Sequence, residues 1–390
     1  MMRVGYVSTY PPIECGIATY TQYLSTAVKK MQNEVFVISQ YGAKGKHVFP
    51  IFQTGSISFA SDVFVTSTRM TPDVVHIQHE YGLYGTQRGV GIIDLILRYR
   101  LSDIPVVITL HTVYEKLSRE EEIILKHVLD ECSATIVHEQ FQKETLVTAF
   151  EERIPGVEKK IHVIEHGVRE LEPMPSAKAK LGLEGKKVVL LCGYFRPTKG
   201  FHKIVEIFPE ICSREKDAVL VVAGKTRNIE YDEYRRKFFR QLNESPVSDR
   251  ITILRGQFPQ NTFDTIIAAA DVVAMPYEIG AQSGIMAQCF AQGVPVVSSG
   301  LKAFRLIVER SGGGLIAETD EEYPTLILKV LTDDAVSSGL RRNIQSYIRS
   351  EAGWSRISEK HLDVYRQVIT TPYGKAKYVY FPEDEPNETM

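Results

Sequence analysis

Short runs of valine and isoleucine alternate with longer amphipathic segments along most of the chain, and this alternation limits the fold more than any other feature. Examples in the first half are VGYVST, VVHIQH and VVITLH, with a helical pattern at 17–31 after the first of them. Near-continuous runs of this kind are typical of strands buried on both faces, as in parallel sheets. Strands that alternate with helices imply right-handed crossovers, so the sequence predicts doubly wound α/β sheets.

The pattern stops and restarts once, which predicts two domains. With 390 residues the chain is about twice as long as one hydrophobic core usually organises. Residues 169–186 contain two prolines, two glycines and many charges, so we interpret them as a linker. We expect one Rossmann-like domain at 1–168 and a second at 187–355. A helix at 356–370 is a candidate for packing back on the first domain, and a tail follows at 371–390.

The net charge and the cysteine content argue against several classes of binding partner and cofactor. The net charge of −2 argues against nucleic acid as the main partner, because a phosphate backbone demands a basic excess. The five cysteines form no C-x-x-C pair, so neither a zinc site nor a disulfide framework is indicated. No apolar stretch has the length of a signal peptide or a membrane span, and we expect a cytoplasmic protein.

Two questions about partners stay open at this level. LILRYRL and YRRKFFRQL mix basic and apolar residues, which favours a solvated helix face but leaves peripheral membrane contact as the alternative. The oligomeric state is not determined either, and a homo-oligomer remains an option.

Polar residues stand at the ends of the predicted strands of the first half. Two doubly wound domains that face each other bring the carboxyl ends of their strands to a central cleft, which suits two substrates. Gly16 lies in the turn after the first strand, where an anion can approach free backbone N–H groups. His79, Glu80 and Tyr81 stand at the end of a later strand and are candidates for binding an acceptor, and His111 ends VVITLH. Two more such ends carry His138, Glu139, Glu165 and His166.

A bland interpretation of these histidines is a set of satisfied core or surface side chains. Metal binding is a weaker alternative, because the pairs lack the helical i, i+4 spacing and the cysteine partners of common zinc ligands. We therefore expect no metal and no bound cofactor.

The second half places two cations in one turn. The strand KVVLLCGYF leads into RPTKG, with Arg196 and Lys199 beside the start of the next helix. A forked guanidinium, an ammonium and backbone N–H groups together predict a diphosphate site, although a solvated loop is the alternative. The G-x-G-x-x-G pattern is absent from the first turn of both halves, which counts against a nicotinamide or flavin enzyme.

A later stretch, MPYEIGAQSGIMAQCFAQGVPVVSS, supplies groups that suit a sugar. A helix is expected to begin near Ser283 and Gly284, so that its free N–H groups reach the same cleft. Glu278, Gln282 and Gln288 can hydrogen-bond sugar hydroxyls.

These motifs resemble glycosyltransferase family four, the retaining, nucleotide-sugar-dependent enzymes of the GT-B fold. The resemblance covers roughly residues 3–365 and rests on CGIATY, ITLHT, IEHGV, GYFRPTKG and PYEIGAQSGIMAQCFAQGVPVV. CGIATYT with IQHEYGLYG is similar to a bacterial and archaeal subgroup.

The resemblance implies a role for each matching position. Gly16 would lie by the donor phosphate and the acceptor pocket, and His111 would touch the transferred sugar. Arg196 and Lys199 would hold the diphosphate, and the amides around Ser283 and Gly284 would cradle phosphate and sugar. The base would stack near Gly256–Phe258, which makes Gln257 and Phe258 donor-binding candidates.

Three positions depart from the family pattern. Cys15-Gly16 stands where many relatives have two glycines. The two glutamates of the family would fall on Gly280 and Gln288, and neither is a glutamate. Glu278 is a candidate to replace the first, while Gln288 can still bind ribose hydroxyls without charge assistance.

The sequence thus predicts retaining transfer of a hexosyl group from a nucleotide sugar to a saccharide or lipid-linked acceptor. Arg196, Lys199 and helix N-termini would stabilise the leaving diphosphate, with Glu278 and His111 also at the reacting region. Two other interpretations stay open: a sugar phosphorylase of the same fold, and a non-catalytic subunit that binds nucleotide sugars.

Overall fold

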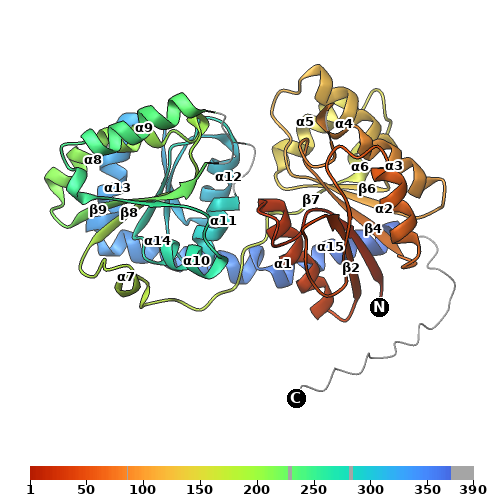
Figure 1. Cartoon of the computed structure of the whole chain (residues 1–390), viewed down its shortest axis with the longest axis horizontal. Helices are drawn as coiled ribbons and strands as arrows, with labels where there is room; N and C mark the ends of the chain where they lie inside the picture. The colour runs from red at the N-terminus through yellow and green to blue at the C-terminus, as the bar shows by residue number, and fades with distance from the viewer. Residues whose placement is uncertain (86, 227–230, 281–283, 370–390) are drawn as a thin grey trace, which may run out of the picture.

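The chain forms two α/β domains that lie side by side, as Figure 1 shows for the computed structural model. The structure describes residues 1–85, 87–226, 231–280 and 284–369. The predicted candidates Gln282 and Ser283 therefore lie outside the described residues.

The first domain is built on a fully parallel sheet of seven strands in the order β3-β2-β1-β4-β5-β6-β7. The central strands are completely buried, in keeping with their uninterrupted apolar runs. The strands are β1 (Arg3–Val7), β2 (Glu34–Gln40), β3 (Val48–Phe52), β4 (Val74–His79), β5 (Val106–Leu110), β6 (Ala134–Val137) and β7 (Ile161–Val163).

Helices cover both faces of this sheet (Figure 1). The helices are α1 (Gly16–Lys30), α2 (Phe59–Thr68), α3 (Gly91–Arg100), α4 (Arg119–Glu131), α5 (Gln140–Phe150) and α6 (Val157–Lys160). Helix α4 begins at a capping box, in which Ser118 accepts a hydrogen bond from the Glu121 amide and the Glu121 carboxylate accepts one from the Ser118 amide.

The second domain repeats the plan with six parallel strands in the order β10-β9-β8-β11-β12-β13. They are β8 (Lys187–Tyr194), β9 (Ala218–Lys225), β10 (Ile251–Arg255), β11 (Val272–Met275), β12 (Val296–Ser299) and β13 (Gly314–Ala317). Its helices are α8 (Phe201–Arg214), α9 (Asp232–Glu244), α10 (Gln260–Ala268), α11 (Gly284–Ala291), α12 (Lys302–Ser311), α13 (Tyr323–Thr332) and α14 (Asp334–Tyr347).

The connection between the domains is anchored to the second one. It contains the short helix α7 (Ala177–Lys180), where the Lys178 ammonium lies 2.7 Å from the Asp271 carboxylate. Leu183 belongs to the core of the second domain.

The last helix, α15 (Trp354–Val368), returns to the first domain after a π-helical turn at Ile348–Ala352. Its buried face joins the core beneath α1, where the hydroxyls of Tyr365 and Tyr6 lie 3.1 Å apart. The chain thus crosses between the two domains twice, and these two covalent connections keep the domains next to each other.

Two strands were not predicted, and both lie at a sheet edge. Strand β3 contains Pro50 and is mostly half-buried, and β13 has only four residues. An edge strand tolerates proline and needs a shorter apolar run, so its sequence signal is weak.

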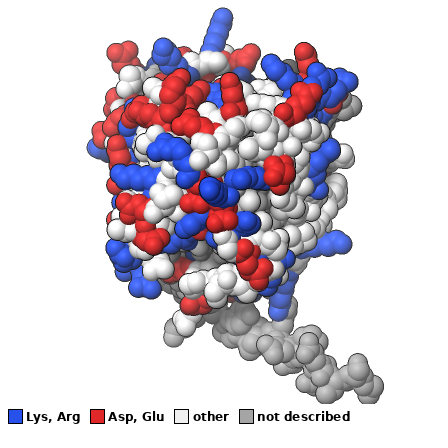
Figure 2. Space-filling model, turned by 90° about the vertical axis from the view of Figure 1, so that its left-hand side faces the viewer, with Lys and Arg blue, Asp and Glu red and all other residues white. Residues whose placement is uncertain are grey.

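Acidic and basic side chains are interspersed on the face of the molecule in Figure 2, which shows no extended basic surface of the kind that nucleic acid demands. Among the described residues, no helix is long and apolar enough to cross a bilayer.

Candidate active site

Both sheets reverse the direction of their strand order at one point, and the candidate residues gather at these two points. The reversals fall between β1 and β4 and between β8 and β11. In open α/β sheets, ligands bind outside the carboxyl ends of the strands at such a switch point. Gly16 follows β1, His79 ends β4, Arg196 and Lys199 follow β8, and Glu278 follows β11.

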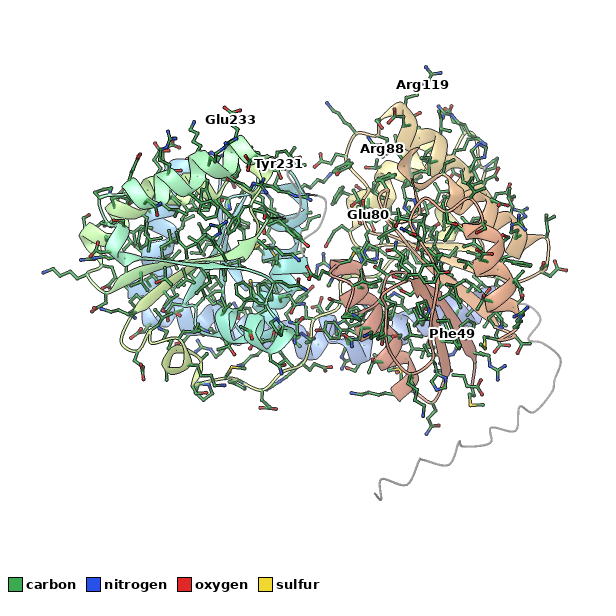
Figure 3. All side chains as sticks on the ribbon, viewed as in Figure 1. Phe49, Glu80, Arg88, Arg119, Tyr231 and Glu233 are labelled. Atoms are coloured by element: carbon green, nitrogen blue, oxygen red, sulfur yellow. The ribbon has the colours of Figure 1, made fainter. Side chains whose placement is uncertain are left out.

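The carboxyl edges of the two sheets face each other. Glu14, in the loop after β1, forms an ion pair with Lys225, the last residue of β9. On another side, Arg310 of α12 donates to the carboxylate of Glu139 at 2.6 Å. Figure 3 shows Glu80 of the first domain and Tyr231 of the second on the sides that face each other. The two sets of strand ends therefore form one shared region.

Arg196 and Lys199 form a concentration of positive charge at the end of β8. The Lys199 ammonium lies 3.5 Å from the centre of the Tyr277 ring, and the Arg196 guanidinium lies 5.5 Å from that of Tyr194. Burial, and next to it the charge of Arg196, lower the pKa of Lys199 to about 8. Within the described parts of the chain, no carboxylate forms an ion pair with either cation. The pair thus presents positive charge that an anionic ligand could neutralise.

The turn that carries these cations is fixed by its neighbours. Gly200 has φ +62°, and a Cβ there would lie 2.0 Å from the Pro276 carbonyl oxygen. The Glu278 amide donates to the Thr198 carbonyl oxygen at 3.0 Å. The turns after β8 and β11 are thus held together as one unit.

Glycines at two helix starts leave room for a ligand. Gly16 begins α1 and Gly284 begins α11. A Cβ built on either glycine would meet no atom of the described residues within 4 Å, so the space at the Cβ position of both glycines is open. Exposed N–H groups at such positions attract anions.

Glu278 and Gln288, the residues nearest to the missing family glutamates, already have protein partners. The Glu278 carboxylate lies 3.3 Å from Lys203, which also pairs with Asp320 at 3.0 Å. The Gln288 carbonyl oxygen accepts a hydrogen bond from Arg169 of the linker. Arg169 in turn forms a bidentate pair with Asp264.

The residues predicted to bind the base follow β10. Gln257 is exposed, whereas Phe258 is half-buried against the core of the second domain. Packing against this core thus holds the Phe258 side chain in place.

The predicted acceptor residues are more enclosed than the sequence suggests. His79 is the last residue of β4, is only 1% exposed, and burial lowers its pKa to about 4. Among the described residues, neither of its ring nitrogens has a hydrogen-bond partner, and the same holds for the buried hydroxyl of Tyr81, whose ring packs edge-on against His79. Glu80 accepts a hydrogen bond from the Thr112 hydroxyl at 2.6 Å.

The imidazole of His111 is engaged on both sides. Its Nε2 lies 2.9 Å from Gln78 Oε1, and its Nδ1 lies 3.4 Å from Nε2 of His138. The Tyr20 ring packs edge-on against His111 and, on another side, against Trp354 of α15. Both ring nitrogens of His111 thus lie within hydrogen-bonding distance of other side chains of the first domain.

His138 and His166, which follow β6 and β7, lie beside the same Tyr20 ring. Within the described ranges, no group of three or more His, Cys, Asp or Glu side chains is arranged to hold a metal ion.

Both domains of the chain resemble known proteins. HepE from Anabaena, solved in complex with UDP and glucose, superposes with a TM-score of 0.72 at 15% identity, covering 94% of this chain and 100% of that chain. The family model described as Glycosyltransferase Family 4 matches residues 15–170, and the one described as Glycosyl transferases group 1 matches residues 186–333. The chain is a member of the GT-B glycosyltransferases.

Individual relatives of this glycosyltransferase are distant. The putative glycosyltransferase YtcC of Bacillus subtilis is 23% identical over 261 residues, which is 63% of this chain and 63% of YtcC. The phosphatidyl-myo-inositol mannosyltransferase of Mycolicibacterium smegmatis is 25% identical over 188 residues, covering 47% of this chain and 46% of the relative. Sucrose-phosphate synthase from Thermosynechococcus elongatus shares the fold, with a TM-score of 0.72, 17% identity and coverage of 94% and 99%.

Sequence reasoning missed several residues that this glycosyltransferase brings to its shared edge. Glu14 and Lys225 meet only because the domains face each other, and Arg169 belongs to a segment interpreted as a linker. The sequence placed Glu139 at the end of a predicted strand, but it did not predict that Arg310 is the ion-pair partner of Glu139.

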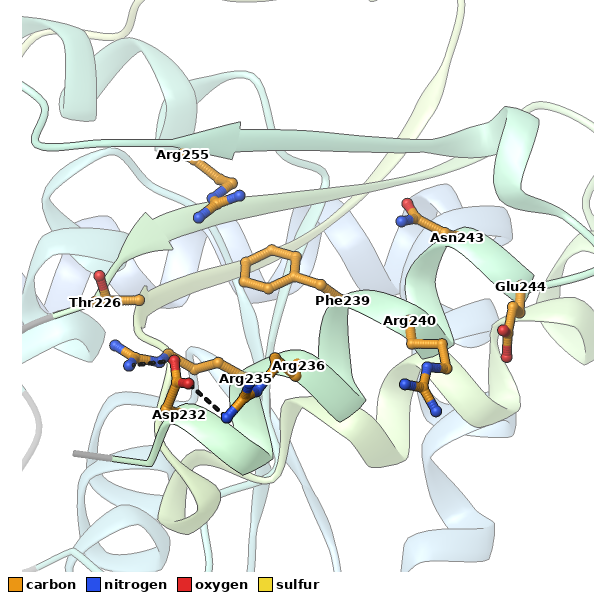
Figure 4. Close-up of a pocket in the computed structure, with 9 residues that line it drawn as sticks. All are labelled: Thr226, Asp232, Arg235, Arg236, Phe239, Arg240, Asn243, Glu244 and Arg255. Carbon is orange, nitrogen blue, oxygen red and sulfur yellow. Dashed lines mark hydrogen bonds and ion pairs between the residues drawn. The ribbon is translucent and has the colours of Figure 1, made fainter. Parts of the chain in front are cut away.

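The basic segment YRRKFFRQL of the glycosyltransferase forms most of α9 and lines a pocket of about 630 Å³ with the ends of β9 and β10 (Figure 4). Asp232 pairs with Arg235 and Arg236, and Arg255 lies 4.5 Å from the centre of the Phe239 ring. Phe238 is buried in the core, so the apolar part of this helix serves packing.

Proposed function

We propose that this glycosyltransferase transfers a hexosyl group from a nucleoside diphosphate sugar to a saccharide or lipid-linked acceptor, with retention of the anomeric configuration. The observation that carries the proposal is the pair Arg196 and Lys199. They lie at the switch point of the second sheet, where burial, with the charge of Arg196 adding to it, lowers the pKa of Lys199 to about 8. A bound diphosphate supplies the negative charge that this arrangement lacks.

Relatives support this choice of donor and acceptor. HepE, which has the same fold, was solved in complex with UDP-glucose. A distant relative carries the name phosphatidyl-myo-inositol mannosyltransferase.

The two cations act on the leaving group. As the bond between the anomeric carbon and the phosphate oxygen breaks, negative charge grows on the nucleoside diphosphate. Arg196, Lys199 and the free N–H groups at the start of α11 stabilise this charge where it develops, and groups fixed in advance do so without reorganisation. Since these groups neutralise the leaving diphosphate, we propose that transfer needs no metal ion.

The acceptor approaches from the first domain. His79 and Tyr81 carry buried polar atoms without a partner, and Glu80 adds a carboxylate beside them. Hydroxyl groups of an acceptor can satisfy such atoms. The new bond from the acceptor oxygen to the anomeric carbon forms on the face that the diphosphate leaves. The hydroxyl proton passes to the departing phosphate oxygen, which yields retention.

Product analysis tests the proposal. The wild-type protein is incubated with UDP-, GDP- and ADP-sugars and a panel of saccharide and lipid-linked acceptors, and proton NMR follows release of the nucleoside diphosphate and the anomeric configuration of the product. We expect one donor to give a product with the configuration of the donor. Arg196→Ala is expected to lower kcat/KM by roughly 100-fold.

Other outcomes of the same experiment point elsewhere. Turnover of a sugar 1-phosphate, or release of one with inorganic phosphate as co-substrate, would identify a phosphorylase. Donor binding without turnover of any acceptor would identify a nucleotide-sugar-binding subunit. Gln288, which stands where the family has a glutamate, is the reason for testing this outcome.

A further inference from the structure

The ion pair between Glu14 and Lys225 joins the two domains inside the region where the donor is proposed to bind. Glu14 stands two residues before Gly16, in the loop that leads into α1. Lys225 ends β9, next to β8 in the sheet. Both side chains are mostly buried, with 35% of Glu14 and 26% of Lys225 exposed.

Lys225 belongs to the same group of cations as Arg196. The Phe195 amide donates to the Lys225 carbonyl oxygen at 3.1 Å, so the two main chains adjoin directly beside Arg196. The charged ends of both residues lie near one ring, because the Lys225 ammonium is 5.6 Å and the Arg196 guanidinium 5.5 Å from the centre of Tyr194. Arg196, Lys199 and Lys225 thus form a set of three cations on the edge of the second domain.

The carboxylate of Glu14 is an anion that the opposite domain places against Lys225, one member of this set. It is an oxyanion with two acceptor oxygens, and in that respect it has the chemistry of a phosphate group. Glu14 also stands just before α1 in the sequence, because that helix begins at Gly16. A single anionic group in this position can be either the carboxylate of Glu14 or a phosphate of a ligand.

We propose that Lys225 is a third residue that binds the diphosphate of the donor, and that Glu14 competes with the donor for it. This inference rests on the proposed function. In the ligand-free protein Glu14 pairs with Lys225 and holds the two edges together. The donor displaces the carboxylate, and Lys225 transfers its hydrogen bonds to a phosphate oxygen. The apparent donor affinity is lowered by the fraction of protein in which Glu14 occupies Lys225.

The test is a calorimetric titration with inorganic pyrophosphate and with UDP-glucose at constant ionic strength. The variants are Glu14→Gln, Lys225→Gln and the double variant. Glu318→Gln is the matched control, because it removes the same charge from an ion pair with Arg305 that lies away from the switch point. Circular dichroism and thermal unfolding check that each variant is folded.

We expect Glu14→Gln to bind pyrophosphate about fivefold more tightly than Glu318→Gln, the scale of releasing one partly exposed ion pair. Lys225→Gln should bind about tenfold more weakly. The double variant should resemble Lys225→Gln, because Glu14 acts only through Lys225, and this non-additivity separates competition from a general effect of charge.

Equal affinities of Glu14→Gln and Glu318→Gln would overturn the competition, and an unchanged affinity of Lys225→Gln would overturn the role of Lys225. Both results would leave binding that depends on Arg196 intact, so the proposed function would stand. Failure of the wild type and of all variants to bind either ligand would instead reject the proposed function and this inference together.

Discussion

The ammonium of Lys199 lies 3.5 Å from the centre of the Tyr277 ring, and within the described residues it forms no ion pair with a carboxylate. Burial is the main cause of its lowered pKa, and the neighbouring charge of Arg196 adds to it. The ring offers only a weak substitute for water, since a cation–π contact recovers about 1–2 kcal/mol. The proton on Lys199 is therefore held less tightly than on an ordinary lysine.

This lowered pKa predicts a pH dependence of donor binding. The diphosphate binds the protonated form, and in the free protein Lys199 loses its proton as the pH rises through about 8. Affinity for the donor should be constant below pH 7 and about tenfold weaker at pH 9 than at pH 7. Calorimetric titrations at both pH values measure this. Lys199→Arg, which keeps its charge, should show no such loss, and equal affinity of the wild type at both values would exclude Lys199 from the site.

Gly200 is predicted to be irreplaceable in the turn that carries the cations. In Gly200→Ala the new Cβ would meet the Pro276 carbonyl oxygen at 2.0 Å, and a main-chain atom cannot rotate away. We expect a loss of more than about 3 kcal/mol in the free energy of unfolding, measured in urea, together with loss of donor binding. Gly182→Ala is the control, because φ there is +65° but the Cβ meets nothing within 4 Å. It should cost only about 1 kcal/mol. Similar losses in the two variants would show that the close approach to Pro276 is not decisive.

The pair Glu139 and Arg310 is predicted to stabilise the joined domains in a pH-dependent way. Burial outweighs the attraction of Arg310 and raises the pKa of Glu139 to about 7, so the carboxyl is largely neutral at pH 6 and charged at pH 8. Arg310→Leu leaves this buried carboxylate without its partner at 2.6 Å.

Arg310→Leu should therefore cost about 3 kcal/mol of unfolding free energy at pH 8 and clearly less at pH 6, where the carboxyl carries its own proton. Urea unfolding at the two pH values checks this. Arg305→Leu, which breaks the exposed pair with Glu318, should change stability little at either pH. A loss at pH 6 as large as at pH 8 would contradict the assignment of the titration to Glu139.

Removal of metal ions is predicted to leave the transfer rate unchanged. In the proposed mechanism, Arg196, Lys199 and the helix N-termini supply the charge that a divalent cation would otherwise bring to the diphosphate. Initial rates before and after dialysis against EDTA measure this. A loss of rate that Mg²⁺ or Mn²⁺ restores would show that a metal ion takes part.

The parts of the fold that could be predicted are those with a strong local signal. Strands such as β4 and β5 are buried on both faces, so their apolar runs are uninterrupted, and the polar residues after them mark the carboxyl edge. The edge strands β3 and β13 have weaker runs because fewer neighbours bury them. The candidate residues were predicted one by one from strand ends, and Arg196 and Lys199 do follow the end of β8, while their role in binding stays a prediction.

The pairings across the site could not be predicted from the sequence. The contact of Glu14 with Lys225, and that of Arg169 with Gln288, depend on how two separately folded sheets are set against each other. No periodicity or motif in a single sequence carries that information. The same limit applies to His111, whose position after β5 was evident but whose ring is held by Gln78 and His138 in the interior.

The central claim is that Arg196 and Lys199 bind the diphosphate of a nucleotide sugar, and calorimetric titration of the wild type and of Arg196→Ala with UDP-, GDP- and ADP-sugars tests it most directly. The account predicts that one donor binds the wild type with a stoichiometry of about one, since Arg196 and Lys199 both lie at the switch point between β8 and β11. It also predicts that the variant, folded as judged by its unfolding transition, loses roughly 100-fold in affinity. Undiminished binding to Arg196→Ala, or no binding of any nucleotide sugar to the wild type, would contradict it.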